Sequence, residues 1–425
     1  MNRTDYAAVG ETLYSAELPN GLPIRVIPKP GYRKTFAVFA ANYGGADRRF
    51  TFQGEPIDTP AGVAHYLEHK MFDTPEGAAL MRLTAAGADP NAFTSETMTA
   101  YHFESTRRFE DNLRTLLSFV SVPYFTQESV DKERGIIAQE IRMYEDSPDF
   151  QVYDNLIKLL YRDSPLRDTV AGTVESIQDI TPDTLYACHK VFYHPSNMAL
   201  CVVGDVDPAA VEAAAREILP VAPMDRPGRD YGPDEGLAPA ETYCGIRREV
   251  ASPLFMIGAK LGPAPRGEAA LRERLTAGLT LRCLCGVSSP FYLRGYGDGL
   301  LNATFGSDFD YAAGQGILTF EGETTHDPRE ILDALAGEIR RIQKDGVDPA
   351  LFVRQKKAGL GGRIRALGNF RGLALSQAEG CFTGYQPLDA FRVTEEIGPE
   401  DVDRWVREKL DPERFALSAV YPKED

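Results

Sequence analysis

Short apolar runs in the first half of the chain predict β-strands. Residues 22–27 follow the turn signal Asn20-Gly21, and residues 36–40 are apolar and strand-like. Residues 198–203 predict a buried strand that stops at Gly204. Two further segments look extended, namely 91–95 and 100–103.

Apolar residues spaced three and four apart predict helices among these strands. One helical pattern covers residues 62–72, a second covers 109–120 and a third covers 128–144. The dipeptide Thr181-Pro182 predicts the start of a further helix, because proline is favoured in the first turn. The apolar residues that we expect to face inward are Leu113, Leu116, Leu117 and Val120 on the second helix, and Val130, Ile136, Ile137 and Ile141 on the third.

The second half of the chain repeats the first at an offset of about 217 residues, without gaps. A helix that starts at proline, a turn proline and a closing strand recur in the same order. We infer two copies of one domain. The matched pairs are Ile180 with Ile397, Pro182 with Pro399, Pro195 with Pro412, Ala199 with Ala416, Leu200 with Leu417 and Val203 with Val420.

These elements predict an α+β fold with two tandem homologous domains at residues 1–217 and 240–425. Each domain mixes strands with long helices, so we expect a largely antiparallel sheet packed on one face by helices. The segment 218–239 is rich in proline, glycine and aspartate, and this composition predicts a linker between the domains.

Composition excludes several classes of protein. The 425 residues are 43% hydrophobic, so a disordered or collagen-like chain is excluded. The formal net charge of −16 disfavours binding to a phosphate backbone and would attract basic peptides more than acidic ones. No apolar run is long enough for a membrane span, and residues 1–6 lack the apolar core of a signal peptide. Six cysteines without C-x-x-C spacing favour free thiols in a reducing cytoplasm.

The candidate chemistry lies in the first helical pattern. His65, Glu68 and His69 form the pentad H-x-x-E-H. Residues four apart share a helix face, so His65 and His69 can hold one Zn²⁺ ion. Glu68 is placed to act on a water at the metal instead of binding the metal itself. The alternative is a surface helix with two incidental histidines.

A catalytic zinc needs a third protein ligand, and the third helical pattern offers two candidates. Glu133 and Glu140 are seven residues apart, so both lie on one helix face. One of them could ligate the zinc, and the other could accept the imidazole N–H of a ligand histidine. Without the pentad, both would be read as solvated charges.

These motifs resemble the pitrilysin/insulinase family of zinc metallopeptidases, which includes the mitochondrial processing peptidases. The family signature is H-x-x-E-H followed some seventy residues later by the second glutamate of an E-x6-E pair, and Glu140 fits that position. The resemblance implies that His65, His69 and Glu140 bind one zinc ion per chain. It further implies that Glu68 is the general base and that Glu133 accepts a hydrogen bond from a ligand histidine without binding the zinc itself.

The resemblance also implies how substrate is bound. The segment Asn91-Ala92-Phe93-Thr94-Ser95 is similar to the family's substrate-pairing edge strand, with Asn91, Ala92 and Phe93 as the expected substrate-binding residues. Arg294 is similar to an arginine that contacts substrate from the silent half. The tyrosine expected about seven residues after that arginine is replaced by Leu301, or by Asn302 with one gap. We therefore expect a partner chain to complete the site.

At the repeat offset, His65, Glu68 and His69 correspond to residues that cannot hold zinc: Arg282, Cys285 and Gly286. The second half is therefore expected to be silent. Residues 67–72 look most similar to a bacterial cytoplasmic branch whose active chain pairs with an inactive homologue. A homodimer or a heterodimer with an inactive homologous subunit is thus expected.

The sequence therefore predicts a zinc-dependent endopeptidase. The resemblance implies a clamshell chamber that admits unstructured peptides or precursor and leader peptides but not folded proteins. The alternatives are a non-catalytic scaffold subunit of a larger paired complex and a clamp that binds peptides without cutting them. Zinc content and cleavage of unstructured peptides, with and without chelator, would separate these classes.

Overall fold

The computed structural model describes residues 1–424, which divide into two compact units. Three segments of chain make up the first unit: Met1–Ile141, Asp168–Tyr231 and Ile364–Leu388. The second unit is formed by Arg142–Arg167, Gly232–Arg363 and the described residues from Asp389 onward.

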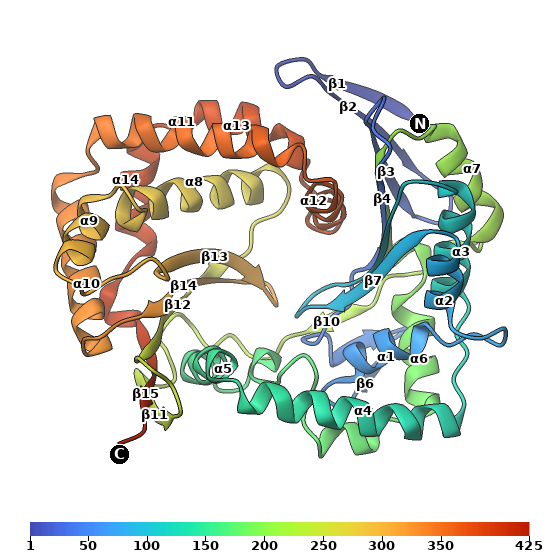
Figure 1. Ribbon diagram of the computed structural model, residues 1–425, viewed down its shortest axis with the longest axis horizontal. Helices are drawn as coiled ribbons and strands as arrows, with labels where there is room; N and C mark the ends of the chain where they lie inside the picture. The colour runs from blue at the N-terminus through green and yellow to red at the C-terminus, as the bar shows by residue number, and fades with distance from the viewer. Residues whose placement is uncertain (425) are drawn as a thin grey trace. The chain divides into compact units, whose positions relative to one another are not determined.

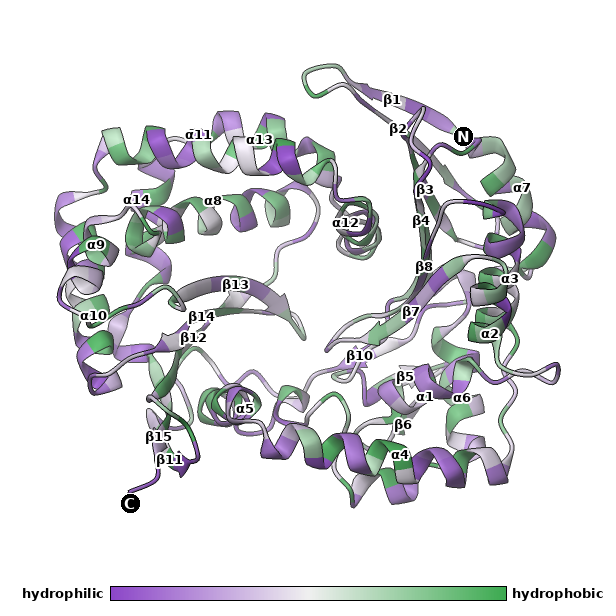
Figure 2. Cartoon of the chain, viewed as in Figure 1, coloured by the Kyte–Doolittle hydropathy of each residue, from purple (hydrophilic) through white to green (hydrophobic). Residues whose placement is uncertain are grey.

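A seven-stranded sheet forms the centre of the first unit (Figure 1). Only β3 and β9 run parallel, and every other neighbouring pair is antiparallel. Figure 2 shows a hydrophilic β1 at one edge and hydrophobic strands at the centre. In order across the sheet, the strands are β1 (Asn2–Tyr6), β2 (Glu11–Glu17), β3 (Pro23–Pro28), β9 (Met198–Gly204), β4 (Thr35–Ala41), β8 (Thr99–Ser105) and β7 (Ala88–Thr94).

Helices cover both faces of this sheet. All seven residues of β4 are buried, which requires a cover on each side. The alternate side chains Phe36 and Val38 of β4 share one apolar cluster with Phe370 and Ala374 of α12 (Phe370–Thr383). The opposite face is covered by α2 (Ala79–Ala85), α3 (Phe109–Ser121) and α7 (Pro208–Ile218).

The remaining elements of the first unit position the pentad. Helix α1 (Val63–Met71) packs against β7, β8 and α6 (Pro182–Phe192). The long helix α4 (Gln127–Asp146) begins in this unit and ends in the second. A separate three-stranded sheet is formed by β10 (Gly228–Asp230), β5 (Arg49–Phe52) and β6 (Glu55–Asp58).

Strand β10 belongs to the segment that the sequence predicted to be a linker. Arg229 donates from its Nε to Asp47 Oδ1 at 2.8 Å, and the Tyr231 hydroxyl donates to the same oxygen at 2.9 Å. Asp47 is 1% exposed, so these bonds compensate a buried carboxylate. Part of the segment 218–239 is therefore built into the first unit.

The second unit repeats the strand order of the first. Its five strands follow the order β11-β15-β12-β14-β13, which matches β3-β9-β4-β8-β7, and only β11 and β15 are parallel. The repeat inferred from the sequence is thus confirmed as a repeated fold. The strands are β11 (Tyr243–Arg248), β15 (Ala416–Pro422), β12 (Leu254–Pro263), β14 (Gln315–Glu323) and β13 (Gly306–Ala312).

Each sheet receives one helix from the other half of the sequence. Helix α12 lies on the sheet of the first unit, whereas α5 (Pro148–Leu160) packs on β12 and β15 of the second. The compact units therefore do not follow the repeat boundaries at 1–217 and 240–425. The other helices are α8 (Glu268–Cys285), α9 (Pro290–Gly297), α10 (Pro328–Asp345), α11 (Pro349–Ala366), α13 (Ala390–Glu396) and α14 (Pro399–Lys409). Short 3₁₀ turns lie at Pro165–Arg167, Ser176–Asp179, Pro195–Asn197, Pro387–Asp389 and Pro412–Arg414.

The predicted elements agree with the structure to within a few residues, with one wrong orientation. Ile136 was expected to face inward but is 50% exposed. The buried residues of α4 are Val130, Ile137, Ala138 and Ile141, and Ile136 projects about 100° away from Ile137. None of the described helices is long and apolar enough to cross a membrane.

Candidate metal centre and active site

The N-terminus of α1 is fixed by a close approach of backbone. Gly62 caps the helix with φ of 91°, a conformation that glycine adopts at little cost. A Cβ at this position would lie 2.4 Å from the carbonyl oxygen of Ala171, so only glycine fits. The Tyr66 hydroxyl donates to the carbonyl oxygen of Val130 and thereby ties α1 to α4. These contacts bring the two helices that carry the candidate ligands together.

His65, His69 and Glu140 converge at one point. Each offers a ligand atom, and these atoms all lie within 4.8 Å of one another. His65 Nε2 lies 3.7 Å from Glu140 Oε1, and His69 Nε2 lies 3.5 Å from Glu140 Oε2. Glu140 therefore lies close to both imidazoles, as the predicted three-ligand site requires. It reaches them from α4, although it follows His69 by seventy-one residues in the sequence.

Glu133 orients one of these imidazoles. His69 Nδ1 lies 3.0 Å from Glu133 Oε1, and this bond places a proton on Nδ1 and leaves the Nε2 lone pair directed at the convergence point. The hydrogen bond from His69 holds the pKa of Glu133 below its ordinary value. Glu133 Oε2 also lies 3.7 Å from Nζ of Lys70, a lysine that is 2% exposed and pairs with Asp73. Lys70 was not among the predicted site residues, although a lysine directly after the ligand candidate His69 was a usable signal in the sequence.

The residues fit a zinc ion. Two imidazoles and one carboxylate are the donor set of many catalytic zinc sites. Burial, reinforced by the charge of His69, lowers the pKa of His65 to about 4, so its ring is neutral at pH 7. The buried Nδ1 of His65 has no hydrogen-bond partner among residues 1–424. Burial alone would lower the pKa of His69, but the bond to Glu133 and the surrounding carboxylates outweigh it and raise that pKa. The same negative charges would favour a bound cation.

Glu68 lies beside this group without belonging to it. Its side chain is 8% exposed, and its Oε2 accepts a hydrogen bond of 2.6 Å from Thr94 Oγ1. Burial raises the pKa of Glu68, while Thr94 and His69 oppose that shift. A buried carboxylate with a raised pKa suits a group that accepts and returns a proton. Thr94 lies in the predicted edge strand 91–95, but its contact with Glu68 was not predicted from the sequence.

The predicted substrate-binding residues Asn91, Ala92 and Phe93 lie on β7, which pairs with β8 alone. The register shows which main-chain groups of β7 point away from β8. In an antiparallel pair of strands, the main-chain groups of successive residues point alternately toward and away from the partner strand. Pro90 has no N–H to donate, so we place it among the residues of β7 whose main-chain groups point away from β8. Ser95 N–H donates to Met98 O at 2.8 Å, which fixes the same alternation from the other end. The main-chain groups of Ala92 therefore point to the free edge, where its N–H donates to Asn91 Oδ1 at 2.8 Å.

The predicted contact residue Arg294 lies on α9 of the second unit. Its Nη2 donates to Glu338 Oε2 of α10 at 2.8 Å, and its side chain is 61% exposed. Its predicted contact with substrate stays a prediction. In the same unit, Cys285 ends α8 and donates from Sγ to the carbonyl oxygen of Leu281 at 3.3 Å. Among the described residues, the metal-ligating group of the first unit has no counterpart in the second.

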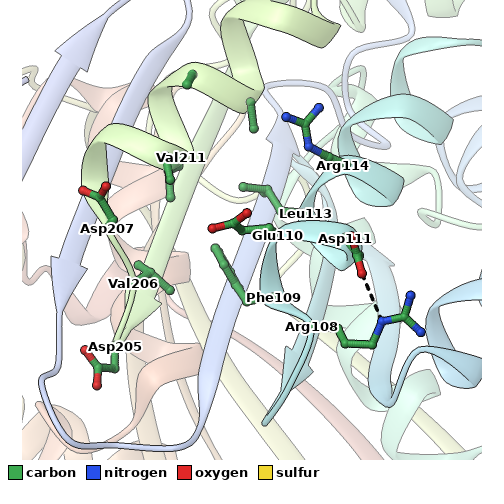
Figure 3. A pocket seen from close by; sticks show the side chains of 13 residues that line it. Arg108, Phe109, Glu110, Asp111, Leu113, Arg114, Asp205, Val206, Asp207 and Val211 are labelled. Atoms are coloured by element: carbon green, nitrogen blue, oxygen red, sulfur yellow. Dashed lines mark hydrogen bonds and ion pairs between the residues drawn. The ribbon is translucent and has the colours of Figure 1, made fainter.

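A cavity of about 550 Å³ lies elsewhere in the first unit, between the start of α3 and the loop that leads into α7 (Figure 3). It contains none of the predicted site residues. Arg108 Nε donates to Asp111 Oδ2 at 3.0 Å at its rim. Asp207 is engaged in capping α7 by accepting from Ala209 N–H at 2.9 Å. The charged groups of this cavity are thus largely used within the fold.

Comparison with known proteins agrees with this division of the chain. The family model described as Insulinase (Peptidase family M16) matches residues 54–174, which include all three candidate ligands. The model described as Peptidase M16 inactive domain matches residues 179–358. The chain is 38% identical over 426 residues to a protein named uncharacterized zinc protease YmfH from Bacillus subtilis (strain 168), and the match covers 99% of each protein.

Solved structures give the same result. An M16-like peptidase from Alicyclobacillus acidocaldarius superposes with a TM-score of 0.93 at 31% identity, covering 97% of this chain and 99% of that one. A protease from Helicobacter pylori has a TM-score of 0.82 at 18% identity, covering 97% and 99%, and supports the fold alone. With the site, the two family models and the full-length relative in agreement, the chain belongs to the insulinase family of peptidases, peptidase family M16.

Proposed function

We propose that this chain is a zinc-dependent endopeptidase that holds one Zn²⁺ ion on His65, His69 and Glu140. The observation that carries the proposal is the convergence of one atom from each of these side chains within 4.8 Å. Glu133 fixes the tautomer of one ligand, and Glu68 lies alongside with a separate hydrogen bond. Site and family together support a peptide-bond hydrolase.

In the proposed hydrolysis, the zinc ion, Glu68 and Glu133 have different roles. When bound, zinc would supply a Lewis acid that activates water and polarises the scissile carbonyl. Glu68 accepts the proton of the attacking water and delivers it to the leaving amine. Glu133 keeps the proton of His69 on Nδ1, away from the convergence point.

The substrate class follows from the free edge of β7. An extended peptide can add to an exposed strand through main-chain bonds that depend little on its sequence. Ala92 presents its main-chain groups at that edge, and Thr94 of the same strand contacts Glu68. We therefore propose unstructured peptides, including precursor or leader peptides, as substrates. The enclosing chamber, the partner chain and the cytoplasmic location stay predictions.

A scaffold or a non-cutting peptide clamp is the alternative function. A scaffold has no need for three converging ligands, a tautomer-fixing carboxylate and an isolated buried glutamate. Burying a polar group costs stability unless it is hydrogen-bonded or paired, and the buried Nδ1 of His65 has no hydrogen-bond partner among residues 1–424. The intact set therefore favours the peptidase.

Replacement of the proposed base tests this function. Glu68→Gln keeps the size of the side chain but cannot accept the proton, so kcat should fall by about 10²- to 10⁴-fold. Zinc content, measured by elemental analysis, should stay at that of the wild type. Glu128→Gln, at an exposed position of α4, is the matched control and should retain full activity. A zinc-loaded Glu68→Gln protein that cleaves an unstructured reporter peptide at the wild-type rate would overturn the assignment.

A further inference from the structure

A single hydrogen bond, donated by a hydroxyl group, holds the carboxylate of Glu68 in place. Thr94 Oγ1 donates to Glu68 Oε2 at 2.6 Å, and no other hydrogen bond to this carboxylate occurs among residues 1–424. The terminal torsion χ3 of a glutamate has no sharp rotamer preference, so the carboxylate plane can take many orientations. One strong bond to Oε2 therefore selects one orientation and leaves the other oxygen for proton transfer.

The proton of Thr94 has little choice of acceptor. Its Oγ1 lies 3.4 Å from Thr99 Oγ1, which is long for a bond between hydroxyls. Thr99 itself donates to the carbonyl oxygen of Tyr43 at 2.8 Å. A hydrogen bond to an ionised carboxylate is shorter and stronger than one between neutral groups. The surroundings of Thr94 thus direct its hydroxyl to Glu68.

The second unit offers an internal comparison. When the two sheets are aligned on the matched pair Val203 and Val420, the strand register places Phe309 of β13 at the position of Thr94. At the position of Glu68, the second unit has Cys285, whose thiol donates to the carbonyl oxygen of Leu281 at 3.3 Å and lies 3.4 Å from Ser307 Oγ of β13. The position of Thr94 therefore has no hydroxyl in the unit in which Cys285 replaces Glu68.

We propose that Thr94 is a positioning residue that holds Glu68 in the orientation required for proton transfer. This inference rests on the proposed peptidase function. Thr94 acts through its side chain, whereas peptide would pair with the main chain of β7. Loss of the hydroxyl should therefore reduce kcat and leave KM nearly unchanged.

The experiment compares Thr94→Val with Thr94→Ser. Valine keeps the branched shape that suits a strand and removes only the hydroxyl, and serine restores the hydroxyl. A charge-assisted bond of this kind suggests a fall in kcat of about 10- to 100-fold for valine, with KM within about twofold and serine within about threefold of wild type. Thr51→Val, at an exposed position of β5, is the control and should match wild type. Zinc content and melting temperature should be the same in all variants.

Two further measurements separate the possible failures. In a Glu68→Gln background, adding Thr94→Val should change the residual rate by less than about twofold, because the two residues act as a unit. Crystal structures should show the Glu68 carboxylate displaced in Thr94→Val and retained in Thr94→Ser. An unchanged kcat in Thr94→Val, an equal loss in Thr94→Ser or an undisturbed Glu68 would overturn the positioning role. A wild-type chain that binds zinc but cuts no peptide would instead overturn the peptidase function, and the crystal structures would still decide whether Thr94 holds Glu68.

Discussion

The two units share a strand order, but the matching helices α1 and α8 bury different kinds of side chain. In the first unit, α1 buries the polar side chains of His65, Glu68 and Lys70. In the second unit, α8 buries mainly leucine, alanine, threonine and cysteine, and the two positions on that helix that match His65 and Glu68 hold Arg282 and Cys285. The same scaffold is therefore compatible with a polar site or with an ordinary core. Function in this chain resides in a few side chains and not in the fold.

The comparison also shows what a polar site requires around it. A buried ionisable group is costly unless it is paired. The first unit meets this requirement with Glu133 for His69 and Lys70, and with Thr94 for Glu68. The buried side chains of α8 include no acidic, basic or imidazole group, and the Cys285 thiol bonds to the carbonyl oxygen of Leu281 and to Ser307 Oγ. A unit can thus keep this strand order without the polar residues, whereas a buried polar site requires several coordinated residues.

The largest expected effect, on zinc content and on peptide cleavage, comes from replacing a candidate ligand of the first unit with the residue found at the matching position of the second. His65→Arg replaces a metal-binding lone pair with a permanent cation. We expect zinc content to fall from one ion per chain to none and peptide cleavage to fall to assay background. The reciprocal change Arg282→His adds one imidazole to a unit that lacks the other ligands, so zinc content should stay at one. A second zinc ion in that variant would show that the second unit is not silent.

An intermediate effect is expected at Glu133. Glu133→Gln keeps the shape of the side chain but removes the charge that fixes His69 and pairs with Lys70. Loss of such an outer carboxylate costs about 10- to 100-fold in metal affinity. Competition with a chelator of known affinity would measure this change, with Glu128→Gln as the control on the same helix. An unchanged zinc affinity would mean that Glu133 does not orient the ligand.

Local patterns were enough to predict part of this site. The i, i+4 spacing of His65 and His69 and the two-turn spacing of Glu133 and Glu140 depend only on helix periodicity. The residues alone left open which carboxylate binds the metal. That distinction depends on how α1 packs against α4, to which the buried Tyr66 contributes. Only the family resemblance favoured Glu140 at the sequence level.

Other features depend on contacts between distant segments, and local patterns do not predict those. The exchange of α5 and α12 between the two halves has no local signal. Strand β10 lies in a proline-rich segment, and its place is fixed by the pair of Arg229 with Asp47, 182 residues away. Ile136 was assigned to the wrong face because hydrophobicity alone does not separate a buried from an exposed isoleucine.

The smallest expected effect concerns the free edges of the two sheets. On each edge strand, a side-chain oxygen accepts a hydrogen bond from the main-chain N–H of the next residue. On β7, Asn91 Oδ1 accepts from Ala92 N–H at 2.8 Å, and on β13, Asp310 Oδ1 accepts from Tyr311 N–H at 2.6 Å. Only β7 contacts the candidate base. Ala92→Pro removes the outward N–H at a position where proline is tolerated in an edge strand.

Loss of one main-chain bond is worth about 1 kcal/mol, so Ala92→Pro should raise KM for an unstructured peptide about fivefold with kcat unchanged. Ala92→Gly keeps the N–H and should leave KM within about twofold of wild type. Asp310→Ala changes the corresponding cap on β13 and should also have no effect. An equal rise in KM for the proline and glycine variants would assign the effect to the lost methyl group. An effect of Asp310→Ala would mean that the edge of the silent unit contributes to peptide binding, and the functional contrast between the two edges would fail.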